Sequence, residues 1–352
     1  MAMPSIMNCK WIVPFAVLLS IPSIGWCADS AAREQAERQV TQPFNNAPLW
    51  REVRKGENPD QTTQVRGVES NILIQSRGET WRELRPPLVL TGGLIVAATL
   101  LVLFGYYRWR GPISLSAKPT GRFIRRFSDP DRFAHWSMGI SFAVLAATGL
   151  AMTFGKYLLL PVLGYTLFSW VAAIAKTTHN FVAPVFLLTL PLFIVLYMRD
   201  NLPRVHDLGW LLKFGGMLSK GSAHIPSGRF NAGEKSLFWA LVCFLCVLLC
   251  ASGVVMLFPN FGQGRAAMQS ANIVHLTGAL LAIAMSCFHV YLGTVGVRGA
   301  YEAMLTGYVD ETWAKEHHEI WYEEVKASRA RQPLVDSVPA EVRQEIARAI
   351  GT

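Results

Sequence analysis

Hydrophobic residues gather in long uninterrupted runs along this chain, and polar residues collect between the runs. A bilayer core about 30 Å thick requires roughly twenty consecutive apolar residues of a helix that crosses it. Five runs meet this requirement, at about 88–107, 133–154, 175–198, 236–258 and 271–297. The pattern therefore predicts an all-α membrane protein with five transmembrane helices.

A sixth hydrophobic run, WIVPFAVLLSIPSIGW, follows Lys10 near the N-terminus and leads into CADS. This is the layout of a secretory signal with a short basic region, and Ala28 is a candidate cleavage position. Trp26 fits poorly two residues before the cut, so an uncleaved anchor helix is the alternative. We expect residues 1–28 to be a signal-like segment and residues 29–86 to be exported.

Composition and charge support a membrane protein and give it an orientation. Hydrophobic residues make up 51% of the chain and charged residues only 16%. Seven Lys and Arg residues lie in 108–132 and six in 199–235, while 155–170 and 259–270, expected to be loops, contain one each. By the positive-inside rule the two basic loops are cytoplasmic, which predicts a multi-pass protein of the bacterial inner membrane.

The net charge of +9 does not indicate nucleic-acid binding. The basic residues follow the membrane topology, and the exported segment 29–86 contains nine basic and nine acidic residues, so it presents no basic surface. Within this segment the short run at 72–74, flanked by turn formers, predicts a β-like stretch.

The chain is expected to consist of six parts. They are a signal-like segment at 1–28, an exported periplasmic extension at 29–86, an extra transmembrane helix at 87–107, a cytoplasmic linker at 108–132, a four-helix domain at 133–297, and a cytoplasmic tail at 298–352. The tail is rich in acidic and aromatic residues, and we expect it to lie at the membrane surface or against neighbouring loops. His317 and His318 are expected to be interfacial polar residues.

Four of the eight histidines fall within or at the edges of the expected spans: His135, His179, His275 and His289. An ionisable side chain is costly in hydrocarbon, so each marks a candidate functional site. His275 and His289 are just under four helical turns apart, about 21 Å along the axis, and share one helix face. Depth along the spans places His179 level with His275 near the outer surface, and His135 level with His289 near the cytoplasm.

Two imidazoles at equal depth on facing helices suit six-coordinate haem iron, which binds one nitrogen on each side of the ring. Because both axial positions are filled, such haems transfer electrons and do not bind oxygen or substrate. The absence of CxxCH excludes a c-type haem. Small residues on the spans allow a flat macrocycle to approach the backbone: Gly139, Ala143, Ala146, Gly149, Gly278 and Ala282.

A transition-metal site, a proton relay and purely structural histidines are the alternatives. The first two normally add Asp, Glu or Cys at the same depth. The four expected spans from residue 133 onward contain no Asp or Glu. The cysteines Cys243, Cys246 and Cys250 imitate a metal motif, but in an apolar helix cysteine usually acts as a small hydrophobe.

Five motifs between about residues 122 and 326 carry a family signal: RFSDPDRFAHW, KTTHN, RFNAGEKSLFW, NIVHLTGALLAIAMSCFHVY and WAKEHHEIWYEE. On these motifs the chain resembles the cytochrome b (gamma) subunit of membrane-bound, quinone-linked formate dehydrogenase. The histidine spacing is shared with related hydrogenase and thiosulfate-reductase cytochromes, whereas NAGEK and the tail motif are more specific to the formate branch. Shorter family members begin near residue 120, so the resemblance does not cover the extension and first span.

The resemblance implies a four-helix transmembrane di-haem cytochrome b bundle. It assigns His179 and His275 to the iron of the haem nearer the exported subunits, and His135 and His289 to the iron of the haem nearer the cytoplasm.

The resemblance also implies that Asn231 and Gly233 belong to a quinone pocket beside the inner haem. The residues themselves leave a second role open, because Asn231 followed by Glu234 is typical of a helix N-cap with a capping-box partner. The two roles can coexist.

The function implied is electron transfer from an exported formate dehydrogenase, through two haems b, to quinone. The implied partners are a catalytic molybdenum or tungsten subunit, an iron–sulfur subunit and membrane lipids, and this chain itself has no formate-oxidising site. One alternative is the cytochrome b subunit of a hydrogenase or another quinone-linked dehydrogenase. An alternative of another class is a non-redox membrane anchor or transporter with structural histidines.

Overall fold

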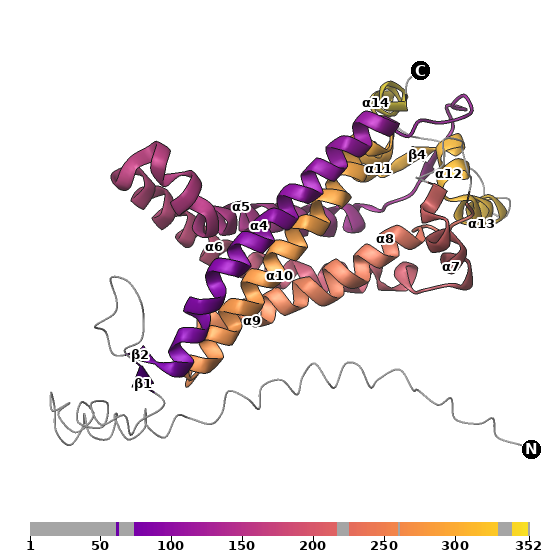
Figure 1. Cartoon of the computed structure of the whole chain (residues 1–352). Helices are drawn as coiled ribbons and strands as arrows, with labels where there is room; N and C mark the ends of the chain where they lie inside the picture. Colours follow the sequence, from indigo (N-terminus) through magenta and orange to yellow (C-terminus); the bar gives the residue numbers. More distant parts are fainter. Residues whose placement is uncertain (1–60, 63–73, 217–224, 260, 330–339, 351–352) are drawn as a thin grey trace, which may run out of the picture. The chain divides into compact units, whose positions relative to one another are not determined.

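The computed structural model describes residues 61–62, 74–216, 225–259, 261–329 and 340–350 (Figure 1). The signal-like segment 1–28, most of the extension 29–86, and His224 lie outside these residues. The regular structure of the described part consists of helices and two two-stranded sheets. The chain divides into two units, with boundaries at Pro87/Leu88, Gly253/Val254 and Val274/His275.

The smaller unit contains the only described part of the extension. Strand β1 (Gln61–Thr62) pairs antiparallel with β2 (Ile74–Gln75), at the end of the predicted β-like run. In the same unit the backbone N–H of Trp81 donates to the Gln269 side chain at 3.0 Å. This bond joins the first and last membrane helices of the described chain at one end.

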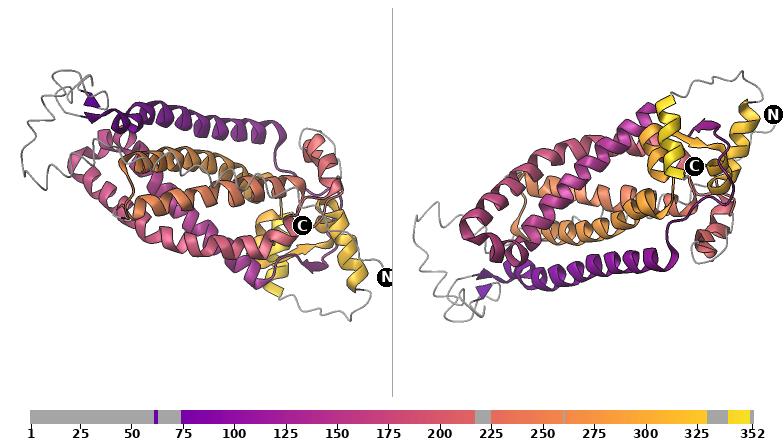
Figure 2. Two further views of the ribbon diagram at one scale, coloured as in Figure 1. Left: turned by 90° about the horizontal axis from the view of Figure 1, so that it is seen from below. Right: turned by 90° about the horizontal axis from the view of Figure 1, so that it is seen from above.

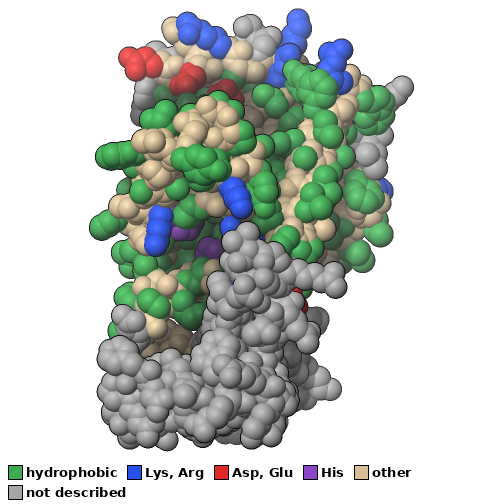
Figure 3. Space-filling view, turned by 60° about the vertical axis from the view of Figure 1, so that its left-hand side comes forward, with side chains coloured by type: hydrophobic (Ala, Val, Ile, Leu, Met, Phe, Trp, Pro, Cys, Tyr) green, Lys and Arg blue, Asp and Glu red, His purple; other side chains and the backbone are tan. Residues whose placement is uncertain are grey.

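Five helical segments are long and apolar enough to cross a membrane: Thr80–Arg110, Asp129–Leu158, Leu160–Asn201, Ala232–Leu257 and Ala266–Gly296. They correspond to the five predicted spans, so the expected all-α membrane fold is confirmed. Large apolar side chains such as Leu101, Leu188 and Val195 are more than 70% exposed on these helices. Figure 3 shows hydrophobic side chains over much of the described surface, a group of charged side chains at the top of the view, and a few further Lys and Arg side chains in its middle.

The elements that form these segments follow in chain order. They are α4 (Ser76–Arg110), α5 (Asp129–Leu158), α6 (Leu160–Met198) with the 3-10 turn η2 (Arg199–Asn201), α8 (Ala232–Leu237) with the π-helix η4 (Phe238–Cys246) and α9 (Val247–Leu257), and α10 (Arg265–Tyr291) with the π-helix η5 (Leu292–Gly296). Figure 2 shows them from two further directions.

The expectation of a loop at 155–170 is wrong, because these residues are mostly helical. Helix α5 continues to Leu158 and α6 begins at Leu160, because the apolar sequence LPVLGYTLFSW continues in helical conformation. The chain bends inside this stretch at Gly164, whose φ of 69° is a left-handed value that glycine adopts without steric cost. His179 therefore lies nineteen residues after Leu160 and not one turn into its helix.

The start of α5 is fixed by a capping box. The Asp131 N–H donates to Ser128 Oγ at 3.4 Å, and the Ser128 N–H donates to the Asp131 carboxylate at 2.9 Å. The Tyr197 hydroxyl, from the end of α6, donates to the Asp131 carbonyl at 2.9 Å. These bonds set the register of α5, and thereby of His135 one turn further on.

Helix α4 packs against α10 within the larger unit, and the two run side by side in Figure 1. A Cβ added to Gly92 of α4 would lie 2.2 Å from Leu280 Cδ1 of α10, so the glycine permits close contact. Nearer the other end, the rings of Tyr106 and Tyr107 meet Tyr291 edge to face, with centroids 6.1 and 6.5 Å apart.

The C-terminal tail packs against the linker before α5, which confirms its predicted position against neighbouring loops. Strand β3 (Phe123–Arg125) pairs antiparallel with β4 (Tyr308–Asp310), and the Asp310 carboxylate accepts 2.8 Å hydrogen bonds from the N–H groups of Gly121 and Thr312. The remaining elements at this end are α7 (Val205–Leu212), η3 (Phe214–Gly216), α11 (Ala300–Thr306), α12 (Glu311–His317), α13 (Glu319–Arg329) and α14 (Ala340–Ile350).

Candidate functional site

The four predicted histidines form two facing pairs inside the larger unit. The ring centroids of His179 on α6 and His275 on α10 lie 6.2 Å apart. Those of His135 on α5 and His289 on α10 lie 5.9 Å apart. Figure 3 shows histidine side chains in a hollow among hydrophobic side chains. The pairing expected from helix depth is present.

The spacing of both pairs fits a metal ion bound between two imidazoles. Metal–nitrogen bonds of about 2.0 Å, typical of imidazole ligands, place the two ring centroids roughly 6 Å apart when the rings lie on opposite sides of the ion. Two neutral imidazoles on opposite sides are the donor set of six-coordinate haem iron. The residues present therefore fit a haem at each pair.

The His179 ring is held by a hydroxyl from the neighbouring helix α5. Thr148 Oγ1 lies 2.9 Å from His179 Nδ1. The same hydroxyl lies 2.8 Å from the Val144 carbonyl oxygen of its own helix, to which it donates. Since Nδ1 is engaged on this side, Nε2 is the nitrogen left to bind a metal.

The His275 ring has an equivalent partner on α9. Ser252 Oγ lies 3.1 Å from His275 Nδ1 and donates to the Leu248 carbonyl oxygen at 2.8 Å. Ser252 is buried. Sequence analysis missed both Thr148 and Ser252, because only the packing of separate helices shows which hydroxyl of an apolar span faces a histidine.

Two glycines leave room beside this pair. A Cβ added to Gly149 would lie 3.6 Å from His179 Cε1, and one added to Gly253 would lie 3.4 Å from His275 Cε1. Gly149 was predicted to allow close approach, whereas Gly253 was not singled out. Gly278, also predicted, packs against Leu249 instead.

The His135–His289 pair lies in a different environment. The Nδ1 atom of His135 is buried, and within the described residues it has no hydrogen-bond partner. Aromatic rings surround the imidazole, with Trp136 at 5.4 Å and Phe193 at 6.2 Å between centroids. An orphaned ring nitrogen in an apolar site is consistent with an imidazole that binds a group through one of its nitrogens.

The alternative of a protein-ligated transition-metal site finds no support in the described part of the chain. No group of three or more His, Cys, Asp or Glu side chains comes together there in a way that could hold a metal ion. Cys243, Cys246 and Cys250 are free thiols on the apolar helices η4 and α9.

Asn231 is the N-cap of α8. Its Oδ1 accepts from the Glu234 N–H at 2.9 Å, and the Glu234 carboxylate accepts from the Asn231 N–H at 2.8 Å, so the predicted capping box is present. A Cβ on Gly233 would lie 2.7 Å from the Trp210 ring, so packing already explains this glycine. The Glu234 carboxylate is near enough to His289 to act on it electrostatically, which places the start of α8 beside the second pair.

A network of buried and partly buried charges joins the helix ends around this region. Arg229 donates to the carboxylates of Asp131 on α5 and Asp200 on η2 at 2.7 and 2.5 Å. Burial by itself lowers the pKa of Arg229, but hydrogen bonds to the two carboxylates outweigh it and raise that pKa. Arg126, also buried, pairs with Glu234 at 3.1 Å, and burial lowers its pKa. The network fixes α5, α6 and α8 relative to one another.

His318 is not the interfacial residue expected from the sequence. Its side chain is 2% exposed, and its Nδ1 lies 2.8 Å from the Gly228 carbonyl oxygen, to which it donates. Burial, together with the nearby Arg126 charge, lowers the pKa of His318 well below its usual value, so the ring is neutral. The prediction failed because the burial depends on contacts with the distant segment around Gly228.

His206 lies outside both histidine pairs and is partly buried, with a side chain 26% exposed. Its Nε2 lies 3.6 Å from the Asp207 carboxylate, which pairs with buried Lys235 at 2.8 Å.

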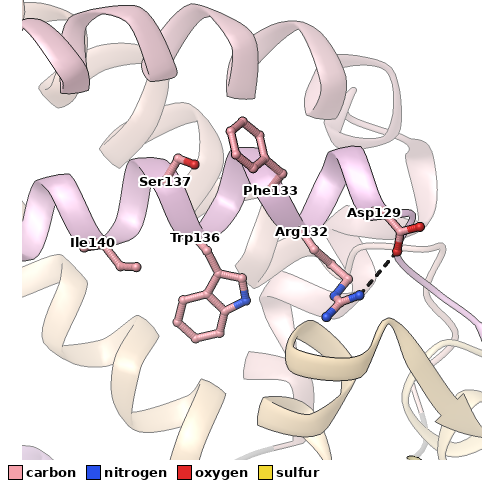
Figure 4. Close-up of a pocket in the computed structure, with 6 residues that line it drawn as sticks. All are labelled: Asp129, Arg132, Phe133, Trp136, Ser137 and Ile140. Atoms are coloured by element: carbon pink, nitrogen blue, oxygen red, sulfur yellow. Dashed lines mark hydrogen bonds and ion pairs between the residues drawn. The ribbon is translucent and has the colours of Figure 1, made fainter.

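A surface cavity of about 360 Å³ lies along the first turns of α5 (Figure 4). Arg132 and Trp136 point to the same side of the helix in the figure, and both donate to the Met304 carbonyl oxygen, at 3.2 and 3.4 Å. None of the four paired histidines lines this cavity, although Trp136, which does line it, lies beside the His135 ring.

Comparison with known proteins identifies the family. A family described as prokaryotic cytochrome b561 matches residues 126–307, just over half of the chain. The cytochrome b556(Fdn) subunit of the nitrate-inducible formate dehydrogenase of Escherichia coli (strain K12) is 28% identical over 222 residues, which cover 62% of this chain and 98% of the relative. The b556(fdo) subunit of the same strain is 29% identical over 212 residues, 59% of this chain and 96% of the relative.

A third relative, the formate dehydrogenase cytochrome b556 subunit of Haemophilus influenzae, is 28% identical over 224 residues, covering 62% of this chain and 90% of the relative. The resemblance inferred from the motifs is thus confirmed.

Proposed function

Because the chain belongs to the prokaryotic cytochrome b561 family and is a multi-pass membrane cytochrome b, we propose that it is the electron-transfer subunit of a quinone-linked formate dehydrogenase. In this proposal an exported molybdenum or tungsten subunit oxidises formate, and an iron–sulfur subunit delivers the electrons to this chain. Quinone receives them. Two haems b, when bound, supply the one-electron chemistry between these partners.

The observation that carries the proposal is the pair of facing imidazoles at each of two positions along α10. Their spacing suits two haems, each of which two imidazoles would hold: His179 with His275, and His135 with His289. Such sites exclude substrate from the metal and leave electron transfer as the chemistry available. The names of the relatives, all cytochrome subunits of formate dehydrogenases, support the choice of electron donor.

Orientation follows from charge. Arg126 belongs to the basic segment 108–132 and Arg229 to the basic segment 199–235, and each donates to the other's backbone carbonyl, at 2.9 and 3.0 Å. The two segments therefore meet at this network, and we assign this end of the larger unit to the cytoplasm. The His135–His289 pair then holds the inner haem and the His179–His275 pair the outer haem, nearer the exported subunits of a bacterial inner-membrane complex.

Quinone is proposed to bind at the start of α8, beside the inner haem. Asn231 uses Oδ1 for its cap, and no hydrogen bond of its Nδ2 group is found among the described residues. This amide can donate to a quinone carbonyl without breaking the cap. The Gly233 backbone, packed against Trp210, is the second proposed contact.

The direction of transfer sets a requirement on the protein. Each 100 mV of membrane potential, inside negative, opposes inward movement of one electron by about 2.3 kcal/mol. The residues around the inner haem must therefore favour the reduced state more than those around the outer haem.

The experiment uses membranes that contain the complete complex. We expect formate, and not hydrogen, to reduce the b-type haems, which is seen as an increase in their α-band absorption. A quinone analogue should then reoxidise them. Reduction by hydrogen alone would instead assign the chain to a hydrogenase. Absence of any b-type absorption would support the non-redox anchor.

A further inference from the structure

The two histidine pairs differ in what their Nδ1 atoms contact. In the first pair, both Nδ1 atoms meet a hydroxyl on a neighbouring helix: Thr148 Oγ1 at 2.9 Å from His179 and Ser252 Oγ at 3.1 Å from His275. In the second pair, the buried Nδ1 of His135 has no partner among the described residues. Hydrogen bonding thus distinguishes two sites whose metal-binding geometry is nearly the same.

We infer that Thr148 and Ser252 are positioning residues that fix His179 and His275 as Nδ1–H tautomers and lower the midpoint potential of the outer haem relative to the inner one. The inference rests on the proposed function, since it takes a haem to lie between the two imidazoles. It extends that proposal by giving two further side chains a role in setting the direction of electron flow.

The positions of the protons follow from the contacts of each hydroxyl. Thr148 Oγ1 lies 2.8 Å from the Val144 carbonyl oxygen, and Ser252 Oγ lies 2.8 Å from that of Leu248. A carbonyl oxygen can only accept, so a proton must lie between the two oxygens, and it is the single hydroxyl proton. Toward the imidazole each hydroxyl oxygen is therefore an acceptor.

The imidazole must then donate from Nδ1. With the proton on Nδ1, the lone pair is on Nε2. Both rings of the pair thus present the same metal-binding nitrogen to the space between them.

The sign of the effect on potential follows from ligand basicity. An acceptor on the N–H side of a metal-bound imidazole draws the proton away from the ring and makes the other nitrogen a stronger donor. Stronger donation favours the oxidised iron, which carries more positive charge, and so lowers the midpoint potential. Because His135 lacks such an acceptor, the inner haem retains the higher potential, which is the order that inward electron transfer requires.

The test is a redox titration of the full chain, purified with its partner subunits, as wild type and as Thr148→Val and Ser252→Ala. Valine has nearly the shape of threonine but cannot accept a hydrogen bond. We expect one of two midpoint potentials to rise in each variant, changing the ratio of oxidised to reduced haem at a fixed potential by roughly twofold to tenfold, the range of a net hydrogen bond. The other midpoint potential stays unchanged.

Two controls separate hydrogen bonding from packing. Thr148→Ser keeps the hydroxyl and is expected to keep the wild-type potential. Thr99→Val removes a hydroxyl of α4 that donates to the Ile95 carbonyl of its own helix at 2.8 Å, its one hydrogen bond within the described residues, and should change neither potential. If Thr148→Val loses one haem, retention of that haem in Thr148→Ser still supports a positioning hydroxyl, whereas loss in both contradicts it.

The inference is overturned if both haems are present and neither midpoint moves in Thr148→Val and Ser252→Ala, or if both midpoints move together. Wild-type protein without haem would instead overturn the proposed function itself, so the two failures are distinguishable.

Discussion

His179 and His275 face each other from separate helices with their ring centroids 6.2 Å apart, and each ring is hydrogen-bonded on the far side by a hydroxyl of a third or fourth helix. Four helices, α5, α6, α9 and α10, therefore contribute to one pair of imidazoles. The pair can form only if these four helices keep a defined position relative to one another.

The first prediction separates the two roles of Asn231. Asp at this position can still cap α8, because its carboxylate accepts from the Glu234 N–H, but it lacks the amide donor proposed to bind quinone. We expect Asn231→Asp to raise the quinone KM by about tenfold, the effect of one lost hydrogen bond, and to leave thermal stability unchanged. Asn231→Ala should impair both. An unchanged KM in the aspartate variant would leave Asn231 as a cap alone.

The second prediction concerns the buried network around Arg229. Arg229→Ala leaves the carboxylates of Asp131 and Asp200 without their shared cation at the ends of α5 and α6. Removal of one partner of a fully buried ion pair costs about 3–5 kcal/mol. Because the Arg229 and Asp200 side chains are 20% and 30% exposed, we expect a loss in the free energy of unfolding in detergent near the lower end of this range.

Arg122 is the matched control, because its pair with Glu311 at 3.0 Å is exposed on the arginine side. Arg122→Ala should cost no more than about 1 kcal/mol. Equal losses in the two variants would show that the network around Arg229 has no special role in holding the helices.

The spans and the histidine pairs could be predicted from the sequence because both depend on local information. Length and hydropathy define a span, and two histidines on one helix face need only the helical repeat. Thr148 and Ser252 could not be distinguished in this way, since Thr99 and Thr294 occur in equally apolar helices and, in the part of the chain that the structure describes, their hydroxyls bond to their own helix backbone. Which hydroxyl faces a histidine depends on how separate helices pack.

Two further features depended on contacts that the sequence does not reveal. His318 is buried against the distant Gly228, whose carbonyl oxygen accepts a hydrogen bond from its ring. The sequence has two adjacent histidines, His317 and His318, and does not show which of them is buried. Helix α6 was predicted too short. The span was expected at 175–198, whereas the apolar residues before it, from Leu160 and past the bend at Gly164, belong to the same helix.

The third prediction is a pH dependence that arises from His318. Its pKa in the folded protein lies well below the usual value of about 6.5. Below pH 6.5 the unfolded chain therefore binds a proton that the folded chain does not, and stability decreases as the pH falls, by at most about 1.4 kcal/mol per pH unit from this group. Above pH 6.5 the group contributes no pH dependence.

The measurement compares wild type with His318→Asn, whose amide can replace the Nδ1 donor to Gly228 but does not titrate. The difference in melting temperature between the two proteins should change between pH 7.5 and pH 5.5, with wild type losing more stability on acidification. A difference that is the same at both pH values would contradict a neutral buried imidazole.

The fourth prediction tests the packing of α4 on α10. Gly92→Val would place new atoms against Leu280, whose Cδ1 lies 2.2 Å from the added Cβ, and we expect a loss of about 1–3 kcal/mol from overpacking. Gly105 on the same helix has nothing within 4 Å of an added Cβ, so Gly105→Val is the control and should have little effect. Equal thermal stability of the two variants would argue against close contact at Gly92.

The central claim, that the facing imidazoles bind two haems, is tested most directly by the amount of b-type haem per polypeptide in the purified full-length chain. The account predicts two haems in wild type and one in His275→Ala, because the His135–His289 pair remains intact in that variant. His206→Ala, which changes a histidine outside both pairs, should retain two. A colourless wild-type protein, or full haem content after loss of His275, would contradict the claim.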